Sequence, residues 1–355
     1  MRTVPVSPAT LRRADAECAD RIECTDATST ITSSEIRLVS RPRGLPTLEN
    51  FERAQSELAP PRDGQVLVRN LYMSVDPYMR ARMHEEAYMP PFQPGQALTG
   101  AAIGEVVQSQ ASGLAPGDIV SSAYGWREYF VADAADVRRI DRPFQPVSTH
   151  LGVLGGTGLS AWVGLNLVDV KAGDRVFVSG AAGAVGSIAG QLARLRGCFV
   201  VGSAGSAAKV RMLRDELGFD AAINYRNGDL LGELKAAAPE GIDVYFDNVG
   251  GEHLEAAISI MRPHGRISAC GAISTYNDER PSPGPRNLFE IVTKRLTIRG
   301  FIVLDSLDQM PRFVAEVTPL VAAGKLVSKE TIVEGIDRAP QAFIDMLRGG
   351  NVGKM

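Results

Sequence analysis

The stretch from Arg175 to Val201 restricts the fold of this chain more than any other part of it. It opens with RVFVS, a β-branched run typical of a buried parallel strand, and continues with Gly180, Gly183 and Gly186 at three-residue spacing. The helical pattern SIAGQLARLRG follows at once. Such a turn directs free backbone N–H groups and a helix N-terminus at one point, which favours a bound phosphate. The match to the dinucleotide fingerprint G-x-G-x-x-G is incomplete, because Ala181 takes its first place, and the glycines could instead serve only a tight crossover.

The helix after this turn should bury Ile188, Leu192 and Leu195 on one face and end at Gly197. Around it, strand patterns alternate with helix patterns. The strand candidates are RVFVS, CFVVG, AAINY, IDVYFDN, RISAC and RLTIRGFIVL, and the helix candidates are GSIAGQLARLRG, SAAKVRMLRDELG, DLLGELKAAA and EHLEAAISIM. This alternation predicts an α/β fold whose parallel sheet has helices on both faces.

The residues from Ser34 to Leu151 show a different sequence pattern, with strands and no alternating helices. The short strand patterns IRLVS, GQVLVRNLYMSV, LTGAAIGEVVQS, GDIVSS and REYFVAD are separated by Gly and Pro, which predicts a small barrel or sandwich. Asp76 to Met83 should form a Pro-initiated helical turn, and His150 to Leu165, apolar all round, a buried helix that bridges two domains. The tract 309–354 should carry a helix, a strand around Glu330 to Val333 and another helix, and return to the first domain.

Charge and composition argue against several classes of protein. The formal net charge is -3 and no basic block stands out, so nucleic acid is not an expected partner. No apolar run reaches the roughly 18 residues that span a bilayer, so no membrane is expected either. Residues 1–32 are polar and rich in acids, which predicts a flexible tail in which a helix around Leu11 to Ile22 is the one candidate element.

The cysteines are too few and too scattered for a disulfide scaffold. They are Cys18, Cys24, Cys198 and Cys270. The last two lie in apolar runs and are expected to be small core residues. This usage fits a reducing cytoplasm.

Taken together, these motifs resemble the medium-chain dehydrogenase/reductase superfamily, in its zinc-independent alkenal and prostaglandin reductase branch. The motifs that carry the resemblance are NLYMSVDPYMR, LGVLGGTGLSAWVGL, GAAGAVGSIAGQLA, GIDVYFDNVGG, CGAISTYN, KRLTIRGFIV and APQAFIDMLRGGNVGK, in family order from about Glu35. The resemblance implies a Rossmann NADP-binding domain at 153–303 and a GroES-like β-barrel catalytic domain made of 33–152 and 304–355. It also implies NADPH-dependent reduction of a C=C bond conjugated to a carbonyl.

The residues after CFVVG bear on the choice of dinucleotide. NAD-specific domains place a carboxylate there for the ribose 2'-OH, whereas Ser203 to Ser206 include none and Lys209 follows within one helical turn. A lysine and hydroxyls attract a 2'-phosphate, so the sequence indicates NADPH/NADP+. The resemblance implies Lys209 and Tyr225 at that phosphate; for Lys209 the alternative is a solvated helix residue.

The resemblance also implies a set of further cofactor-binding residues. They are Ala182, Gly183, Ala184, Val185, Asn248, Cys270, Ile273, Ser274, Tyr276, Phe301, Val303 and Asn351. The segment from Ala182 to Val185 would contact the pyrophosphate. For Asn248, a role confined to the Asn-Val-Gly-Gly turn is the alternative.

Reduction of an enone needs a donor for the carbonyl oxygen, where negative charge develops. Tyr276 is the candidate, because a tyrosine with a pKa of about 10 stays protonated at neutral pH and can donate. The resemblance implies the same residue; a ring that only packs against the cofactor is the alternative. Tyr78 matches a tyrosine that lines the substrate cleft in this family, with core packing as the alternative, and Arg80 is expected to pair with a local carboxylate.

No catalytic metal is predicted. Zinc-dependent relatives carry a glycine-histidine-glutamate signature, and the matching stretch here is Gly95-Gln96-Ala97. The four histidines, none of which is paired at metal-ligand spacing, are His84, His150, His253 and His264.

The leading interpretation is therefore an NADPH-dependent reductase of small enones or enals. Two alternatives stay open: the same chemistry on a specialised biosynthetic intermediate or a quinone, and an NADPH-binding protein without catalysis. The resemblance further implies a homodimer, formed by edge strands near Leu296 to Phe301.

Overall fold

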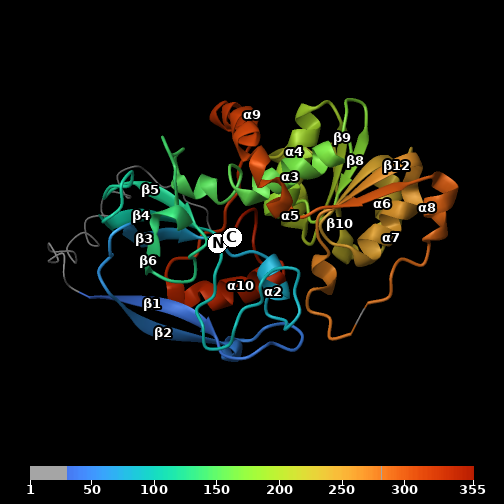
Figure 1. Cartoon of the computed structure of the whole chain (residues 1–355). Helices are drawn as coiled ribbons and strands as arrows, with labels where there is room; N and C mark the ends of the chain where they lie inside the picture. The colour runs from blue at the N-terminus through green and yellow to red at the C-terminus, as the bar shows by residue number, and fades with distance from the viewer. Residues whose placement is uncertain (1–29, 281) are drawn as a thin grey trace.

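The computed structural model describes residues 30–280 and 282–355, and its centre is a six-stranded parallel sheet in the order β10-β9-β8-β11-β12-β13 (Figure 1). The strands are β8 (Arg175–Val178), β9 (Phe199–Ala204), β10 (Ala221–Asn224), β11 (Ile242–Asp247), β12 (Met261–Ala269) and β13 (Thr297–Gly300). Every pairing between neighbours is parallel. The parallel sheet that the alternating patterns predicted is confirmed.

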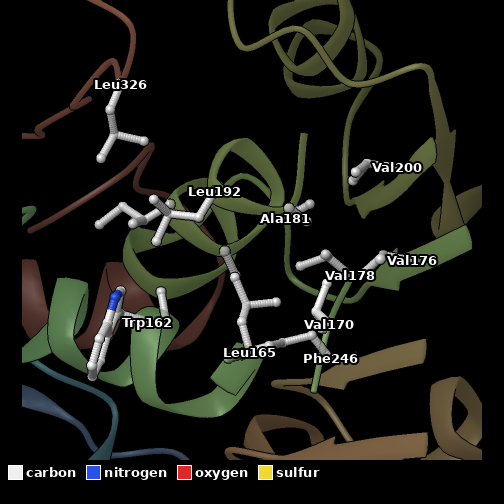
Figure 2. Close-up of a cluster of buried hydrophobic side chains, with 14 of the residues drawn as sticks. Trp162, Leu165, Val170, Val176, Val178, Ala181, Leu192, Val200, Phe246 and Leu326 are labelled. Atoms are coloured by element: carbon white, nitrogen blue, oxygen red, sulfur yellow. The ribbon is translucent and has the colours of Figure 1, made fainter. Parts of the chain in front are cut away.

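Helices cover both faces of this sheet. They are α3 (Gly156–Leu167), α4 (Ala184–Leu195), α5 (Ala207–Asp215), α6 (Leu230–Ala237), α7 (Gly251–Ile260) and α8 (Phe289–Lys294). Side chains of a strand alternate between faces, so Val176 and Val178 join one core cluster with α3 and α4, whereas Phe177 joins the other with α6 and α7. Figure 2 shows the first cluster, with Trp162 and Leu165 of α3, Leu192 of α4, and Val176, Val178 and Phe246 of the sheet.

The buried face of α4 is shorter than predicted. Ile188 and Leu192 are almost fully buried, but Leu195 is 45% exposed, so its predicted burial is wrong. Leu195 is the last residue of the helix, and its side chain is partly in contact with solvent there. Gly197 follows with a φ of 83°, the left-handed conformation in which glycine commonly ends a helix.

Helix α3 is buried, as predicted: its residues from Gly158 to Leu165 are all buried, and it packs with α4 and α9. It begins at Gly156, because Val147–His150 form a separate 3-10 turn. A Cβ on Gly164 would lie 2.6 Å from the Phe246 ring, so the missing side chain lets α3 approach β11 closely.

The first domain contains an antiparallel sheet in the order β6-β3-β4-β5-β7 and a separate hairpin, β1-β2. The strands are β1 (Ile31–Leu38), β2 (Phe51–Leu58), β3 (Gln65–Met73), β4 (Ala102–Ser109), β5 (Ile119–Ser122), β6 (Tyr129–Asp133) and β7 (Arg138–Arg139). The five predicted strands are present; β2 was missed, because FERAQSEL is mostly polar. The predicted helical turn is α2 (Tyr78–Ala81).

The C-terminal tract contains α9 (Met310–Ala322) and α10 (Ala339–Leu347). Helix α10 returns to the first domain, where Phe343 packs with Leu38 and Trp126. Helix α9 packs elsewhere: its Phe313 belongs to the core cluster of α3 and α4. The predicted strand from Glu330 to Val333 is wrong, because Glu330 forms only an isolated bridge and the residues after it are largely exposed.

Three predictions concern the N-terminal residues and membranes. The helix around Leu11 to Ile22, Cys18 and Cys24 all lie outside the described residues. Strand β1 begins at Ile31, so the end of the tail was placed slightly too late. Within the described part of the chain, no helix is long and apolar enough to cross a membrane.

Candidate active site

A cavity of about 1220 Å³ lies at the carboxyl ends of the parallel strands and is lined by residues of both domains. All fifteen site residues that were predicted from the sequence line this cavity. They are Tyr78, Ala182, Gly183, Ala184, Val185, Lys209, Tyr225, Asn248, Cys270, Ile273, Ser274, Tyr276, Phe301, Val303 and Asn351. The structure therefore brings the predicted dinucleotide, substrate and catalytic residues to one place.

The glycine-rich turn forms part of the cavity wall. Gly180 has a φ of 59°, and a Cβ on Gly186 would lie 2.5 Å from the Gly180 carbonyl oxygen, so both positions need glycine. Gly183 is the N-cap of α4 and provides no side-chain cap, which leaves the first helical N–H groups to a ligand. The turn is also paired with a distant segment, because the Gly353 N–H donates to the Ala182 carbonyl at 2.8 Å.

Two cations mark one end of the cavity. Lys209 Nζ donates to the Gly349 carbonyl at 2.8 Å, and Arg226 Nη2 donates to the Arg348 carbonyl at 3.4 Å. Burial, with a smaller effect of Arg226, lowers the pKa of Lys209. Neither cation has an ion-pair partner among the described residues, so the pair is suited to an anionic ligand. Tyr225 lies beside Arg226: a Cβ on Gly205 would lie 2.8 Å from the Tyr225 hydroxyl and 3.2 Å from Arg226 Nε.

A buried carboxylate organises the loop after β11. Asp247 Oδ1 accepts hydrogen bonds from the Tyr245 hydroxyl at 2.7 Å and from the N–H groups of Val249 and Gly250 at 2.9 and 2.7 Å. Burial raises the pKa of Asp247 against the opposing effect of these bonds. Asn248 is fixed in this loop by a bond from its Nδ2 to the Ser179 carbonyl at 2.7 Å, so it serves the turn as well as lining the cavity.

The segment that carries Tyr276 rests on that loop. The N–H groups of Ile273 and Ser274 donate to the carbonyls of Asn248 and Val249 at 3.2 and 3.1 Å. The Tyr276 hydroxyl accepts a long bond of 3.4 Å from a backbone N–H, which leaves its own proton available. Burial raises the pKa of Tyr276, so the hydroxyl stays protonated at neutral pH.

Cys270 is a cavity residue rather than a fully buried core residue. Burial raises the pKa of its thiol to about 12. The thiol is therefore protonated at neutral pH and is not a nucleophile. Cys198, by contrast, lies in the core as predicted.

The first domain contributes Tyr78 to the same cavity, together with Asp76, which belongs to a buried ion pair. Lys354 Nζ lies 2.9 Å from Asp76 Oδ1, both side chains are almost fully buried, and the Ser74 hydroxyl also bonds to Asp76. Burial and then the Asp76 charge raise the pKa of Tyr78 well above its ordinary value, so it too stays protonated. No local pattern of the sequence indicates this ion pair, because its two partners are 278 residues apart.

The expectation for Arg80 is wrong, because its partner is not a carboxylate. Its Nε donates to Asn277 Oδ1 at 3.1 Å, its Nη2 donates to the Gly44 carbonyl at 2.8 Å, and its Nη1 lies 3.0 Å from His84 Nε2. The loop that surrounds the guanidinium presents carbonyl groups, which take the place of a charged partner.

Comparison with known proteins agrees with this arrangement. Residues 34–140 match a family model described as the N-terminal domain of oxidoreductase, and residues 184–319 match one described as zinc-binding dehydrogenase. The 2-alkenal reductase (NADP(+)-dependent) of Nicotiana tabacum is 42% identical over 83% of this chain and 87% of its own. The chain belongs to the medium-chain dehydrogenase/reductase superfamily.

Two further proteins of the superfamily resemble this chain. Prostaglandin reductase 1 of Bos taurus is 42% identical over 88% of this chain and 94% of its own. The crystal structure of CurA from Vibrio vulnificus in complex with NADPH has a TM-score of 0.87 and 36% identity, and it covers 91% of this chain and 98% of that one.

His150 and His253 contact neighbouring groups of the fold. His150 Nε2 accepts a bond from the Phe144 N–H at 2.9 Å, and burial lowers the pKa of His253, which lies between the Phe177 and Tyr225 rings, to about 4. His84 and His264 are exposed. Among residues 30–280 and 282–355, no group of three or more His, Cys, Asp or Glu side chains could hold a metal ion.

Proposed function

We propose that this reductase uses NADPH to reduce the C=C bond of α,β-unsaturated ketones and aldehydes, without a metal ion. The observation that carries the proposal is the composition of this one cavity. It contains a glycine-rich turn, two cations without an ion-pair partner among the described residues, and two tyrosines whose pKa is raised by burial. The names of the relatives, a 2-alkenal reductase and a prostaglandin reductase, support the same chemistry.

The residues present fit NADPH. The turn would hold the pyrophosphate at Ala182 to Val185, because glycines keep the backbone open there. Lys209, Tyr225 and Arg226 would hold the 2'-phosphate, with Arg226 added by the structure to the residues expected from the sequence. When bound, NADPH supplies the hydride that the β-carbon of the substrate accepts.

The tyrosines serve the substrate. Hydride addition moves negative charge onto the carbonyl oxygen, and a donor placed at that oxygen lowers the barrier by about 3 kcal/mol. Tyr276 keeps its proton and has only a long accepted bond at its hydroxyl, so it can donate to this oxygen and support protonation of the α-carbon. Tyr78 lines the same cavity and would contact the substrate.

Oxidation of NADPH in the presence of candidate substrates tests the proposal. The panel should contain an alkenal, phenylbutenone, a quinone and an oxo-eicosanoid, with the saturated carbonyl product identified by mass spectrometry. Turnover of the alkenal or the enone is the expected result. Turnover of the quinone alone would show that quinones, and not enones or enals, are the substrates. Tight NADPH binding without turnover of any compound in the panel would refute the proposal that the protein is an enzyme.

We also propose the division into a catalytic domain of 33–152 and 304–355 and a nucleotide domain of 153–303, and a homodimer in the cytoplasm. Strand β13 supports the dimer: it stands at the edge of the sheet, its residues are all exposed, and Phe289 of the neighbouring α8 is 74% exposed. A second copy could pair along this edge. The free thiols of Cys198 and Cys270 fit a reducing compartment.

A further inference from the structure

Arg80 is a charged side chain with only 1% of its surface exposed, and it lies on α2 two residues after Tyr78. A guanidinium that has left water needs partners for its N–H groups, because an unsatisfied buried charge is strongly destabilising. No carboxylate supplies them among the described residues. The acceptors of the Arg80 N–H groups therefore show which segments this side chain anchors.

The bonds of Arg80 reach three segments. One N–H donates to Asn277 Oδ1 at 3.1 Å, and others donate to the carbonyls of Gly44 at 2.8 Å and Pro42 at 3.4 Å. A fourth contact joins Nη1 to His84 Nε2 at 3.0 Å. Asn277 belongs to the nucleotide domain and the others to the first domain, so one side chain bridges the two.

Asn277 is the residue directly after Tyr276. Before Tyr276, the N–H groups of Ile273 and Ser274 tie the segment to the loop that follows β11. After Tyr276, the bond from Arg80 ties it to the first domain. Tyr276 is thus held between two anchors, one in each domain.

The packing of the neighbouring loop supports the second anchor. Gly44 has a φ of 64°, and a Cβ on it would lie 3.3 Å from Glu279 Oε1 and 3.9 Å from the Asn277 carbonyl oxygen. The loop that Arg80 holds through Gly44 therefore lies directly against residues 277–279. The bond to Asn277 is part of a packed contact between domains.

From these contacts we propose that Arg80 and Asn277 are positioning residues that hold the Tyr276 hydroxyl in the cavity that Tyr78 also lines. The inference rests on the proposed function, because it assigns the two residues to the geometry of that reaction. Helix α2 carries Tyr78 into the cavity and, through Arg80, holds the segment of Tyr276. Loss of the bond lets Tyr276 move relative to the substrate, and a displacement of about 1 Å can lower a rate by as much as about 100-fold.

Steady-state kinetics of Asn277→Ala on phenylbutenone, together with direct NADPH titration, test the inference. We expect kcat to fall about tenfold, the factor that corresponds to one hydrogen bond to a charged group, while Kd for NADPH stays within about twofold. Asn287→Ala is the matched control: Asn287 Nδ2 donates to the Glu255 carbonyl and Ser259 Oγ, both at 2.9 Å, within the nucleotide domain. This control should leave kcat within twofold.

Two further variants separate positioning from general stability. Asn277→Asp keeps an acceptor for Arg80 and should retain wild-type kcat, even if the alanine variant folds poorly. In a Tyr276→Phe background, Asn277→Ala should have no further effect on kcat, because its effect passes through the missing hydroxyl. Unchanged kcat in Asn277→Ala, or an equal loss with and without the Tyr276 hydroxyl, overturns the inference alone. Absence of wild-type turnover on the whole panel overturns the proposed function and the inference with it.

Discussion

Removal of the Tyr276 hydroxyl is the sharpest test of the proposed reaction. The structure supports a protonated donor here, because burial raises the pKa of Tyr276 and its hydroxyl only accepts a 3.4 Å bond from the Ala272 N–H. A donor of this kind in a water-excluded site is worth about 3 kcal/mol, or about 150-fold in rate. Because Tyr276 is only partly buried, we take about 2 kcal/mol, or about 30-fold in rate, as the lower limit for the contribution of its hydroxyl.

We therefore expect Tyr276→Phe to lower kcat on an enone by roughly 30- to 150-fold, with Kd for NADPH nearly unchanged. Stopped-flow measurement of NADPH oxidation at saturating substrate gives the rate, and cofactor fluorescence gives Kd. The pH dependence adds a second readout: the acid form donates and its pKa is raised, so this group should leave wild-type kcat constant up to about pH 10 and lower it only above that.

Tyr225→Phe provides the control, because it removes a hydroxyl from the same cavity at the end where the two cations lie. It should weaken NADPH binding and leave kcat at saturation near the wild-type value. A Tyr276→Phe variant with kcat within twofold of wild type would remove Tyr276 from the mechanism. If Tyr276→Phe lowered the affinity for NADPH as much as it lowered kcat, the result would instead indicate that the Tyr276 ring only packs against the cofactor.

Three other perturbations have clear expected outcomes. Arg226→Ala should raise Kd for NADPH about tenfold and leave Kd for NADH unchanged, since only NADPH carries a 2'-phosphate; equal effects in calorimetric titrations with the two cofactors would contradict that role. Gly186→Ala should abolish NADPH binding because its Cβ would lie 2.5 Å from a backbone oxygen, whereas Gly156→Ala, whose Cβ meets nothing within 4 Å, should bind normally in the same titration. Lys354→Met leaves Asp76 buried without its cation and should cost about 3–5 kcal/mol of unfolding free energy in urea denaturation; an unchanged midpoint would show that the pair contributes little.

Much of the nucleotide half could be predicted from the sequence, because its signals are local. Each strand is a short β-branched run followed by a turn and a helical pattern, and Gly180 to Gly186 mark the crossover without reference to distant residues. The absence of a carboxylate near Lys209 is equally local. The cavity therefore contains every residue that the sequence nominated.

What the sequence did not predict depends on distant partners. Strand β2 forms because β1 lies beside it, although its own polar pattern does not indicate a strand. Leu195 satisfies the helical period, yet its side chain is partly in contact with solvent. Arg80 was expected to meet a carboxylate, yet the fold surrounds it with loop carbonyls and Asn277. The Asp76–Lys354 pair joins two distant segments that no periodicity relates.

The pairing of Gly353 with the glycine-rich turn has a consequence for biosynthesis. The Gly353 N–H bonds to the Ala182 carbonyl, and Asn351 lines the same cavity, so residues made late in translation complete a pocket whose other walls are made early. Domains generally fold as they emerge from the ribosome. The nucleotide half can thus assemble its sheet on a nascent chain while its pocket still lacks one wall. Capture of the dinucleotide then becomes a step that follows translation of the residues around position 353.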